Sequence, residues 1–362
     1  NATSTTLSLT DDTDLAQFAT GDAVYAGGVD PQSFAPVIYT GNGTTQSITT
    51  GFAPSLVWVK NRTGDPNDHV LFDIVRGPGE RIYSNNTNVQ GYEATSLVSF
   101  NADGFTLGGH SSTNGAGIDW VSWSWSAGDT TVTNNDGTIP SQVRSNGEFS
   151  IVSFNTGDTT ALIGHGLTNT PAFIITKSIS DSNPWYCYHT SLGSDGYITL
   201  NQASAADTIA GYWGDPDALT FGVPTSSGNN TGDMIAYCWA ESPTQSFGSY
   251  VGTGVSGLEV TCGFEPAFVL TKCTDGTDDW SIADNQRPLK SLRPNTSDAE
   301  DDSAKVEFTS TGFRILEGNS VRINQAGNNY IYAAFASAGG PSGVIGDITG
   351  LDMTLSESTG TW

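Results

Sequence analysis

Lysine is scarce in this chain, and its placement is the first indication of organised chemistry. Only five lysines occur among 362 residues, yet three of them end copies of one short phrase, and an ionisable residue follows each after twelve or thirteen positions. The pairs are Lys60 with Asp73, Lys177 with His189, and Lys272 with Asp284. Because an isolated charge is costly to bury, this spacing predicts partly buried Lys–Asp pairs between neighbouring strands, and a weaker Lys–His pair in the second copy.

Each of the two paired acids is followed three positions later by an arginine, Arg76 or Arg287. A group repeated within one chain is more often part of a scaffold than a catalyst, so we interpret these residues as structural. The alternative is a glycan-cleaving pair of carboxylates, which such enzymes hold about 5 to 10 Å apart. No pair stands out among the many loop acids, and we expect no enzymatic activity. The most crowded of these acids are Asp275, Asp278, Asp279, Glu300, Asp301 and Asp302.

Acid-rich loops can also bind calcium, through six to eight oxygen ligands. None here matches an EF-hand loop or a nonapeptide calcium repeat, so the sequence leaves a structural calcium ion open and predicts no other cofactor. The weak candidate ligands are Asp215, Asp217, Asp275 and Asp278. The four histidines lack the spacing of a zinc site, and no Gly-x-Ser-x-Gly elbow marks a serine nucleophile.

The elements that must position these residues form an internal repeat, marked by an opening proline strand and a closing aromatic strand. The opening strands are Pro54–Lys60, Pro171–Lys177 and Pro266–Lys272, and the closing strands are Trp120–Trp125, Met234–Trp239 and Tyr330–Phe335. From the proline to the last aromatic residue the separations are 71, 68 and 69 positions. Ordered landmarks at nearly constant spacing predict three homologous units.

The fold class predicted for these units is all-β, with three tandem antiparallel β-sandwich repeats, because no long segment carries a helical apolar period. The two chain ends are each too short for a core of their own, so we expect them to complete one small terminal β module. The alternative is that each end adds a strand to a neighbouring chain. The predicted boundaries are 1–36 and 339–362 for the terminal module, 37–145 for repeat 1 with a linker, 146–245 for repeat 2 and 246–338 for repeat 3.

Tryptophans raise the question of sugar stacking. On the closing strand of the first unit Val121, Trp123 and Trp125 share one face, and the matching positions of the other units are also apolar, so we expect this face to be core. Trp120 points the opposite way. The candidate surface ligand contacts are therefore Trp120, Trp185 and Trp213, with Trp58 as a further one.

The overall charge restricts the partners. With 13 basic and 38 acidic residues the formal charge is −25, which argues against nucleic acid and against anionic membranes. No apolar run is long enough to span a membrane, and residues 1–20 lack the pattern of a signal peptide. Cys187 and Cys238 fall in unit two and Cys262 and Cys273 in unit three, while unit one has none, so we expect free thiols and assembly in a reducing cytoplasm.

The phrases Gly51–Arg62, Leu71–Gly77 and Asp103–Phe105, closing on the first aromatic strand, resemble a repeat domain of tailed bacteriophages, especially marine ones. That domain occurs in tail-fibre-like and other virion structural proteins. The end segments Leu7–Phe18 and Met353–Trp362 also look like phrases from such fibres. The resemblance covers roughly residues 37–338 and implies a place on a virion rather than a reaction.

We therefore expect a virion surface protein, part of a tail fibre or of a capsid-attached fibre or decoration, that attaches to host-surface glycans. It would be assembled in the host cytoplasm, contact other virion proteins and form a homo-oligomer, such as a homotrimer, although three repeats in one chain could imitate a trimer internally. The alternatives are a polysaccharide depolymerase of a tailspike and a purely structural decoration.

Overall fold

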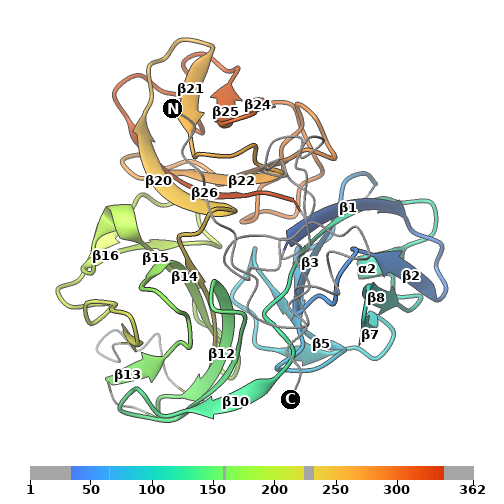
Figure 1. Cartoon of the computed structure of the whole chain (residues 1–362). Coiled ribbons are helices and arrows are strands. Elements are labelled where there is room, and N and C mark those ends of the chain that lie inside the picture. Colours follow the sequence, from blue (N-terminus) through green and yellow to red (C-terminus); the bar gives the residue numbers. More distant parts are fainter. Residues whose placement is uncertain (1–33, 65, 158–159, 224–231, 338–362) are drawn as a thin grey trace, which may run out of the picture. The chain divides into compact units, whose positions relative to one another are not determined.

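The computed structural model describes residues 34–64, 66–157, 160–223 and 232–337, and these residues confirm the predicted all-β class with several antiparallel sheets (Figure 1). The terminal module predicted from residues 1–36 and 339–362 lies outside the described residues except at its inner end. Residues 34–36 belong to the first strand of repeat 1, so that strand begins earlier than expected. Among the residues described, no helix has the length and apolarity that a membrane crossing requires.

Repeat 1 (34–128) is built from strands and one short helix. They are β1 (Phe34–Thr40), β2 (Gln46–Thr49), β3 (Leu56–Asn61), β4 (Val70–Asp73), β5 (Glu80–Tyr83), β6 (Gly91–Tyr92), β7 (Leu97–Asn101), β8 (Gly104–Leu107), α2 (Ser111–Asn114) and β9 (Asp119–Trp125).

Repeat 2 (129–242) has the same main-sheet strands, preceded by an extra hairpin, and a smaller second sheet of two strands. Its elements are β10 (Thr131–Asn134), β11 (Ser141–Ser145), β12 (Phe149–Asn155), β13 (Ala161–Gly164), β14 (Pro171–Ser178), β15 (Tyr186–His189), the 3-10 helix η1 (Thr190–Leu192), β16 (Gly196–Thr199), β17 (Asp207–Thr208), β18 (Thr220–Val223) and β19 (Asp233–Ala240). The hairpin β10–β11 pairs with β12, so the stretch predicted as a linker belongs to the sheet of repeat 2.

Repeat 3 (243–337) has the fewest strands. It consists of β20 (Gln245–Val251), β21 (Leu258–Thr261), β22 (Phe268–Cys273), β23 (Ser281–Asp284), β24 (Val306–Thr309), β25 (Gly312–Ile315) and β26 (Asn329–Phe335).

The three repeats share one topology. In each main sheet the first strand pairs with the closing strand, which pairs with the proline-to-lysine strand, which pairs with the next strand in sequence; the orders are β1-β9-β3-β4, β12-β19-β14-β15 and β20-β26-β22-β23. A smaller sheet covers one face of each main sheet, formed by β2-β8-β7, β13-β18 or β21-β25-β24. Every residue of β3, β14 and β22 is buried, as expected for a strand covered on both faces.

The register shows that the three copies are equivalent. On the closing strand the lysines lie opposite the same position, as Lys60 pairs with Val121, Lys177 with Ile235 and Lys272 with Ile331. The proline-to-lysine strand therefore occupies the same position and register in each copy, as the sequence repeat predicted.

The second face of each main sheet does not meet solvent, because a core shared by all three repeats covers it. The last aromatic residues of the closing strands form a triangle at its centre: the ring of Trp125 lies 6.0 Å from Trp239 and 5.5 Å from Phe335, and the latter two lie 6.0 Å apart. Each repeat keeps a separate core between its two sheets. Residues 34–337 thus belong to one compact unit rather than three independent sandwiches.

Candidate functional site

The three lysines occupy equivalent buried positions, but the predicted pairs with Asp73, His189 and Asp284 are wrong. All three side chains are buried, and each ammonium donates to the carbonyl of the following residue, Asn61, Ser178 or Cys273. The Lys60 ammonium also donates to the Ser297 carbonyl of repeat 3 at 3.0 Å, and that of Lys272 donates to the Ala203 carbonyl of repeat 2 at 3.3 Å. Lys60 and Lys272 therefore join loops of neighbouring repeats, whereas Lys177 donates to the Asp181 carbonyl within its own repeat.

The register explains the error in the predicted pairs. In an antiparallel hairpin, residues at equal distances from the turn lie opposite each other. Asp73 therefore lies opposite Leu56, and Lys60 is four residues further along that strand. Four residues of strand separate the two by about 13 Å. His189 and Asp284 lie opposite Phe173 and Phe268 in the same way.

Burial lowers the pKa of each lysine to about 8, because the ammonium loses its hydration. Nearby acids oppose this effect without forming an ion pair with the lysine; Asp298 is the largest such influence on Lys60, and Asp181 acts on Lys177. The lysines are thus held by carbonyl oxygens rather than by carboxylates.

Asp73 connects repeats 1 and 2. Its carboxylate accepts a hydrogen bond of 2.8 Å from the phenol of Tyr237 on β19 and another of 2.5 Å from Nε of Arg76. Arg76 also donates to the side-chain oxygen of Gln90. The backbone N–H of Gln90 in turn donates to the Ile179 carbonyl of repeat 2. The acid, the arginine and the phenol together form a buried polar group at this contact.

Asp284 makes the equivalent contact between repeats 3 and 1. Its carboxylate accepts from Nε1 of Trp123 on β9 at 2.9 Å and from Nε of Arg287 at 2.8 Å. Glu300 extends this network, because it lies 3.4 Å from Arg287 and pairs with Arg62 of repeat 1 at 2.9 Å.

His189 completes the cycle between repeats 2 and 3. Its Nε2 lies 3.0 Å from the backbone carbonyl of Tyr332 on β26, and its Nδ1 accepts from the N–H of Ser191. Burial lowers its pKa to about 4, although the carbonyl of Tyr332 favours the proton. This imidazole therefore acts as a neutral donor where the other two contacts use an acid.

A second set of equivalent residues, Trp185, Trp280 and His69, also lies at the contacts between repeats. Trp185 donates to the carbonyls of Tyr83 and Asn86 in repeat 1, and Trp280 donates to the carbonyl of Thr199 in repeat 2. The matching position of repeat 1 is His69, whose pKa is held well below its usual value by burial and by Lys60.

None of the predicted tryptophan ligand contacts lies on the surface. Trp120 packs in the core of repeat 1 and stacks on Tyr39, Trp185 lies in the shared core, and Trp213 packs in the core of repeat 2 and donates to the Gly196 carbonyl. Trp58 is buried as well, and its Nε1 donates to His69. Both faces of each main sheet are covered, so a side chain that points away from the shared core enters the separate core of its own repeat.

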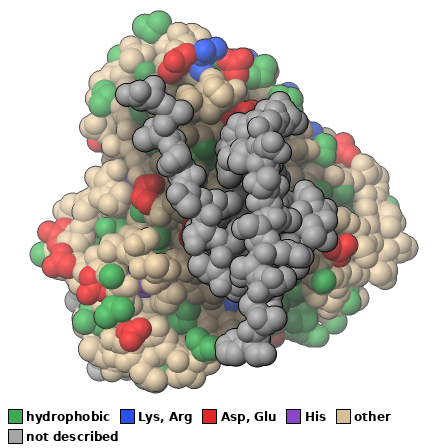
Figure 2. Space-filling view, viewed as in Figure 1, with side chains coloured by type: hydrophobic (Ala, Val, Ile, Leu, Met, Phe, Trp, Pro, Cys, Tyr) green, Lys and Arg blue, Asp and Glu red, His purple; other side chains and the backbone are tan. Residues whose placement is uncertain are grey.

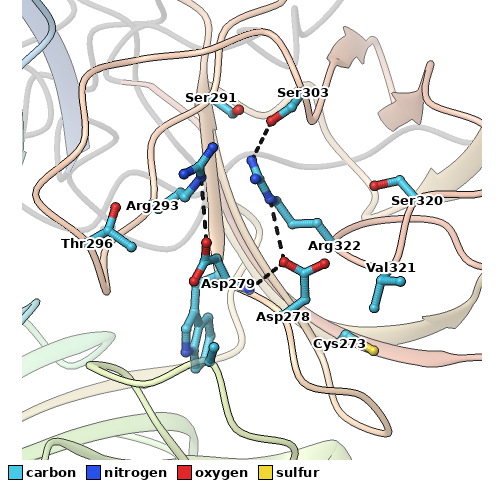
Figure 3. Close-up of polar contacts among 12 residues, drawn as sticks. Cys273, Asp278, Asp279, Ser291, Arg293, Thr296, Ser303, Ser320, Val321 and Arg322 are labelled. Carbon is cyan, nitrogen blue, oxygen red and sulfur yellow. Dashed lines mark hydrogen bonds and ion pairs between the residues drawn. The ribbon is translucent and has the colours of Figure 1, made fainter.

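Some of the crowded acids of repeat 3 lie beside two arginines, and Figure 3 shows Asp279 facing Arg293 and Asp278 facing Arg322. Arg293 pairs with Asp298 at 2.8 Å, with Asp279 at 3.7 Å and with Asp301. Arg322 lies 3.9 Å from Asp278 and donates to the hydroxyl of Ser303. Hydrogen bonds from Ser303 and Ser291 outweigh burial and lower the pKa of Asp301 to about 2. This cluster braces the loop between β23 and β24.

The weak calcium candidates are not brought together. Asp215 and Asp217 lie in repeat 2, where the latter accepts from the backbone of Leu219 and Thr220. Asp275 accepts from the backbone and side chain of Asn329, and Asp278 lies beside Arg322. Within the described ranges, no group of three or more His, Cys, Asp or Glu side chains is placed to hold a metal ion. All four cysteines, which lie in this part of the chain, are free.

Sequence reasoning missed the partners of the acids. Tyr237 and Trp123 occupy the same position of the closing strand and donate across contacts between repeats, as their matching register with the lysine strand shows. A signal was present for the second set, because Trp185 and Trp280 each follow the lysine of their copy by eight positions.

One family matches this arrangement over nearly its whole extent. The sequence model described as a domain of unknown function, DUF7483, matches residues 30–339, and the chain belongs to that family. The match covers all three repeats as one domain, in agreement with the shared core. Neither the curated proteins nor the solved structures contain a match to the chain.

Proposed function

We propose that this member of the DUF7483 family is a structural protein of the bacteriophage virion surface, part of a tail fibre or of a fibre or decoration attached to the capsid. The observation that supports a structural role is the use of the repeated ionisable residues. Asp73, His189 and Asp284 each connect one repeat to the next. The location on a virion follows from the resemblance of the repeat phrases to phage fibre proteins.

Attachment to host-surface glycans is the role proposed for the outer loops, since the candidate tryptophans are buried. Such loops are rich in Asn, Ser, Thr and Gly, and their individual contacts with sugars would be weak. Copy number on the particle multiplies weak contacts through effective concentration. On the face shown in Figure 2, acidic side chains are scattered over the three repeats, which suits a protein that stays dispersed in salty water.

The location is tested with an antibody raised against residues 34–337. Immunogold electron microscopy of intact, purified particles should place the label on the tail or on the capsid surface, and the number of gold particles bounds the copy number. Host cells infected with an unrelated phage serve as the control. Particles that carry no label, while the infected lysate contains the antigen, would remove the virion proposal.

The attachment role is tested separately. Purified protein should give a signal on an array of glycans from the host surface, with a tenfold excess of the matching free glycan as competitor. The depolymerase alternative makes a different prediction, because incubation with host capsule would then release new reducing ends. Release of sugar would overturn the non-enzymatic proposal, and silence in both assays would leave a purely structural decoration.

A further inference from the structure

The contact between repeats 2 and 3 differs from the other two at three equivalent positions together. The equivalent sets are Asp73, Arg76 and Tyr237; Asp284, Arg287 and Trp123; and His189, Leu192 and Ala333. The first two sets each hold a carboxylate between an arginine and a donor from the next repeat. In the third set the acid, the arginine and the donor are all replaced.

The replacements fit one another chemically. Ala333 has no donor to offer, and the polar group that faces the neighbouring repeat is the backbone carbonyl of Tyr332, an acceptor. A carboxylate at this point would set two acceptors against each other. The imidazole of His189, with its proton on Nε2, supplies the missing donor, and its Nδ1 is occupied by the N–H of Ser191. Both ring nitrogens are satisfied only while the ring is neutral.

The residues described around His189 offer no counter-charge. The side chain is 1% exposed, and Phe173 lies against its ring with 5.9 Å between ring centres. It borders a narrow crevice with no room for a water molecule, lined otherwise by Phe173, Leu270, Trp280, Ile331, Tyr332 and Ala333. The titratable group among these is the phenol of Tyr332, which donates to Thr261 within repeat 3. Among the described residues no ion pair joins repeats 2 and 3, whereas Arg62 and Glu300 join repeats 1 and 3.

We propose that the contact between repeats 2 and 3 is an acid-sensitive seam, at which protonation of His189 separates the two repeats. The added proton on Nδ1 faces the N–H of Ser191, and the cation lies in an apolar site whose described lining contains no acid. Opening the seam gives the imidazolium access to water. The other two contacts use arginine-held carboxylates at this position and contain no such ring there.

His69 is the other buried imidazole at a contact between repeats, and it takes a proton less readily. Its Nδ1 accepts from Trp58, and the positive charges of Lys60 and Arg287 oppose protonation, while the Arg293 carbonyl favours it. No cation acts on His189 in this way. As the pH falls, the seam between repeats 2 and 3 therefore opens before the contact between repeats 3 and 1.

The sign of the pH effect follows from the lowered pKa. An exposed histidine takes up its proton near pH 6.5, whereas His189 in the closed seam does so at about 4. The closed state is therefore favoured fully above pH 6.5, and this advantage is lost as the pH falls toward 4. Between pH 7 and 4.5 this difference raises the open population roughly 50-fold.

The free cysteines provide a local readout in the unmodified protein. Cys187 lies in the shared core two residues before His189, whereas Cys238 and Cys273 lie inside the separate cores of repeats 2 and 3. Each is labelled with 4,4′-dithiodipyridine at pH 7 and pH 4.5, assigned by peptide mass spectrometry, and its rate is divided by that of the urea-unfolded chain at the same pH. We expect labelling of Cys187 to rise about 50-fold at pH 4.5 and the other two to change far less.

The variant His189→Asn separates this seam from general acid unfolding. Its amide keeps a donor for the Tyr332 carbonyl but cannot be protonated, so labelling of Cys187 should lose its acid dependence. Equal acceleration of Cys187 and Cys238 in the unmodified protein would overturn the proposal, as would an acid response retained in the variant. The first comparison needs no substitution, so it decides the matter even if the variant fails to fold.

Discussion

At the scale of single residues, each of the three buried lysines should contribute more to stability as the pH rises above 7.5. The folded chain releases these protons near pH 8, whereas an unfolded lysine keeps its proton to about 10.5, so the unfolded state binds more protons between these values. Each lysine should therefore add about 2 kcal/mol to the free energy of unfolding between pH 7.5 and pH 9.5. Burial raises the pKa of Cys187 and Cys238, so these two thiols oppose the lysines by about 1 kcal/mol each over the same range. Urea unfolding at the two pH values measures the net change.

The matched variants for this prediction are Lys177→Met and Lys290→Met. The first removes one of the three buried ammonium groups, so its change in the free energy of unfolding from pH 7.5 to pH 9.5 should be about 2 kcal/mol less favourable than that of the unmodified protein, whatever it does to stability at pH 7.5. The second removes an exposed ammonium and should leave the change in the free energy of unfolding between pH 7.5 and pH 9.5 as it is in the unmodified protein. The same pH dependence of the free energy of unfolding in both variants would contradict the contribution of the buried lysines.

Asp284 makes a second prediction at this scale. Replacing it by asparagine keeps an oxygen for the indole of Trp123 but removes the charge beside Arg287, which is 1% exposed. Breaking a buried pair from one side typically costs about 3 to 5 kcal/mol, because a charge is left without its partner. Glu300 lies 3.4 Å from the arginine and moderates the loss. We therefore expect about 3 kcal/mol in urea unfolding.

The control for Asp284→Asn is Asp302→Asn, where the carboxylate is 67% exposed and lies 3.9 Å from Lys305. A surface pair of this kind contributes little, so its loss should change stability by less than about 1 kcal/mol. Similar effects of the two substitutions would mean that the contact between repeats 3 and 1 does not depend on the buried carboxylate.

At the scale of elements, the third contact between repeats should accept the arrangement found in the other two. The triple variant His189→Asp, Leu192→Arg and Ala333→Tyr places an acid, an arginine and a phenol at this contact. These are the residue types that Asp73, Arg76 and Tyr237 supply at the equivalent positions of the contact between repeats 1 and 2. Ala333 borders the narrow crevice, which has no room for a water molecule, so neighbouring side chains must shift to admit the phenol. The acid response of Cys187 labelling should disappear in this variant.

The single change His189→Asp is the comparison for the triple variant. Alone it places a carboxylate against the Tyr332 carbonyl, so it should destabilise the protein by about 1 to 3 kcal/mol. Adding the other two changes should recover most of this loss, since the arginine and the phenol then satisfy the acid. If the losses in the free energy of unfolding at the three positions simply add, the proposed equivalence of the contacts is contradicted.

The elements themselves could be predicted from the sequence, because their signals are local. A proline opens each buried strand, a run of apolar residues continues it, and an aromatic strand closes the unit at near-constant distance. The pairing of Lys60 with Asp73 could not be predicted from spacing, because the position of the turn sets the register of a hairpin. The polarity of residues 129–138 predicts a linker where the structure has strand β10, because three of the four residues of β10 are exposed and the fourth is half-buried.

The candidate site was hidden for a different reason. Alternation along β9 correctly predicted that Val121, Trp123 and Trp125 share an apolar face, but apolarity does not reveal which surface covers that face. The face of Trp123 meets repeat 3, and the opposite face, with Trp120, meets the second sheet of its own repeat. Contacts between copies are long-range, and nothing in the local pattern of one copy indicates them.

At the scale of the whole molecule, the shared core predicts that the repeats do not unfold separately. The triangle of Trp125, Trp239 and Phe335 takes one large aromatic ring from each copy, and the rings stay buried only if all three copies are in place. Above pH 7, where the seam is closed, residues 34–337 should unfold in one transition, with tryptophan fluorescence and far-ultraviolet circular dichroism coincident.

The same core predicts that one repeat excised from the chain is not stable. A fragment of residues 129–242 keeps the separate core of repeat 2 but exposes the apolar face that carries Ile235, Tyr237 and Trp239. It should show a weak, broad unfolding transition and bind a hydrophobic dye, whereas the complete body should bind little. A fragment that unfolds as cooperatively as the complete body would show that the repeats are independent domains, and the cycle of contacts through Asp73, His189 and Asp284 would then be incidental to the fold.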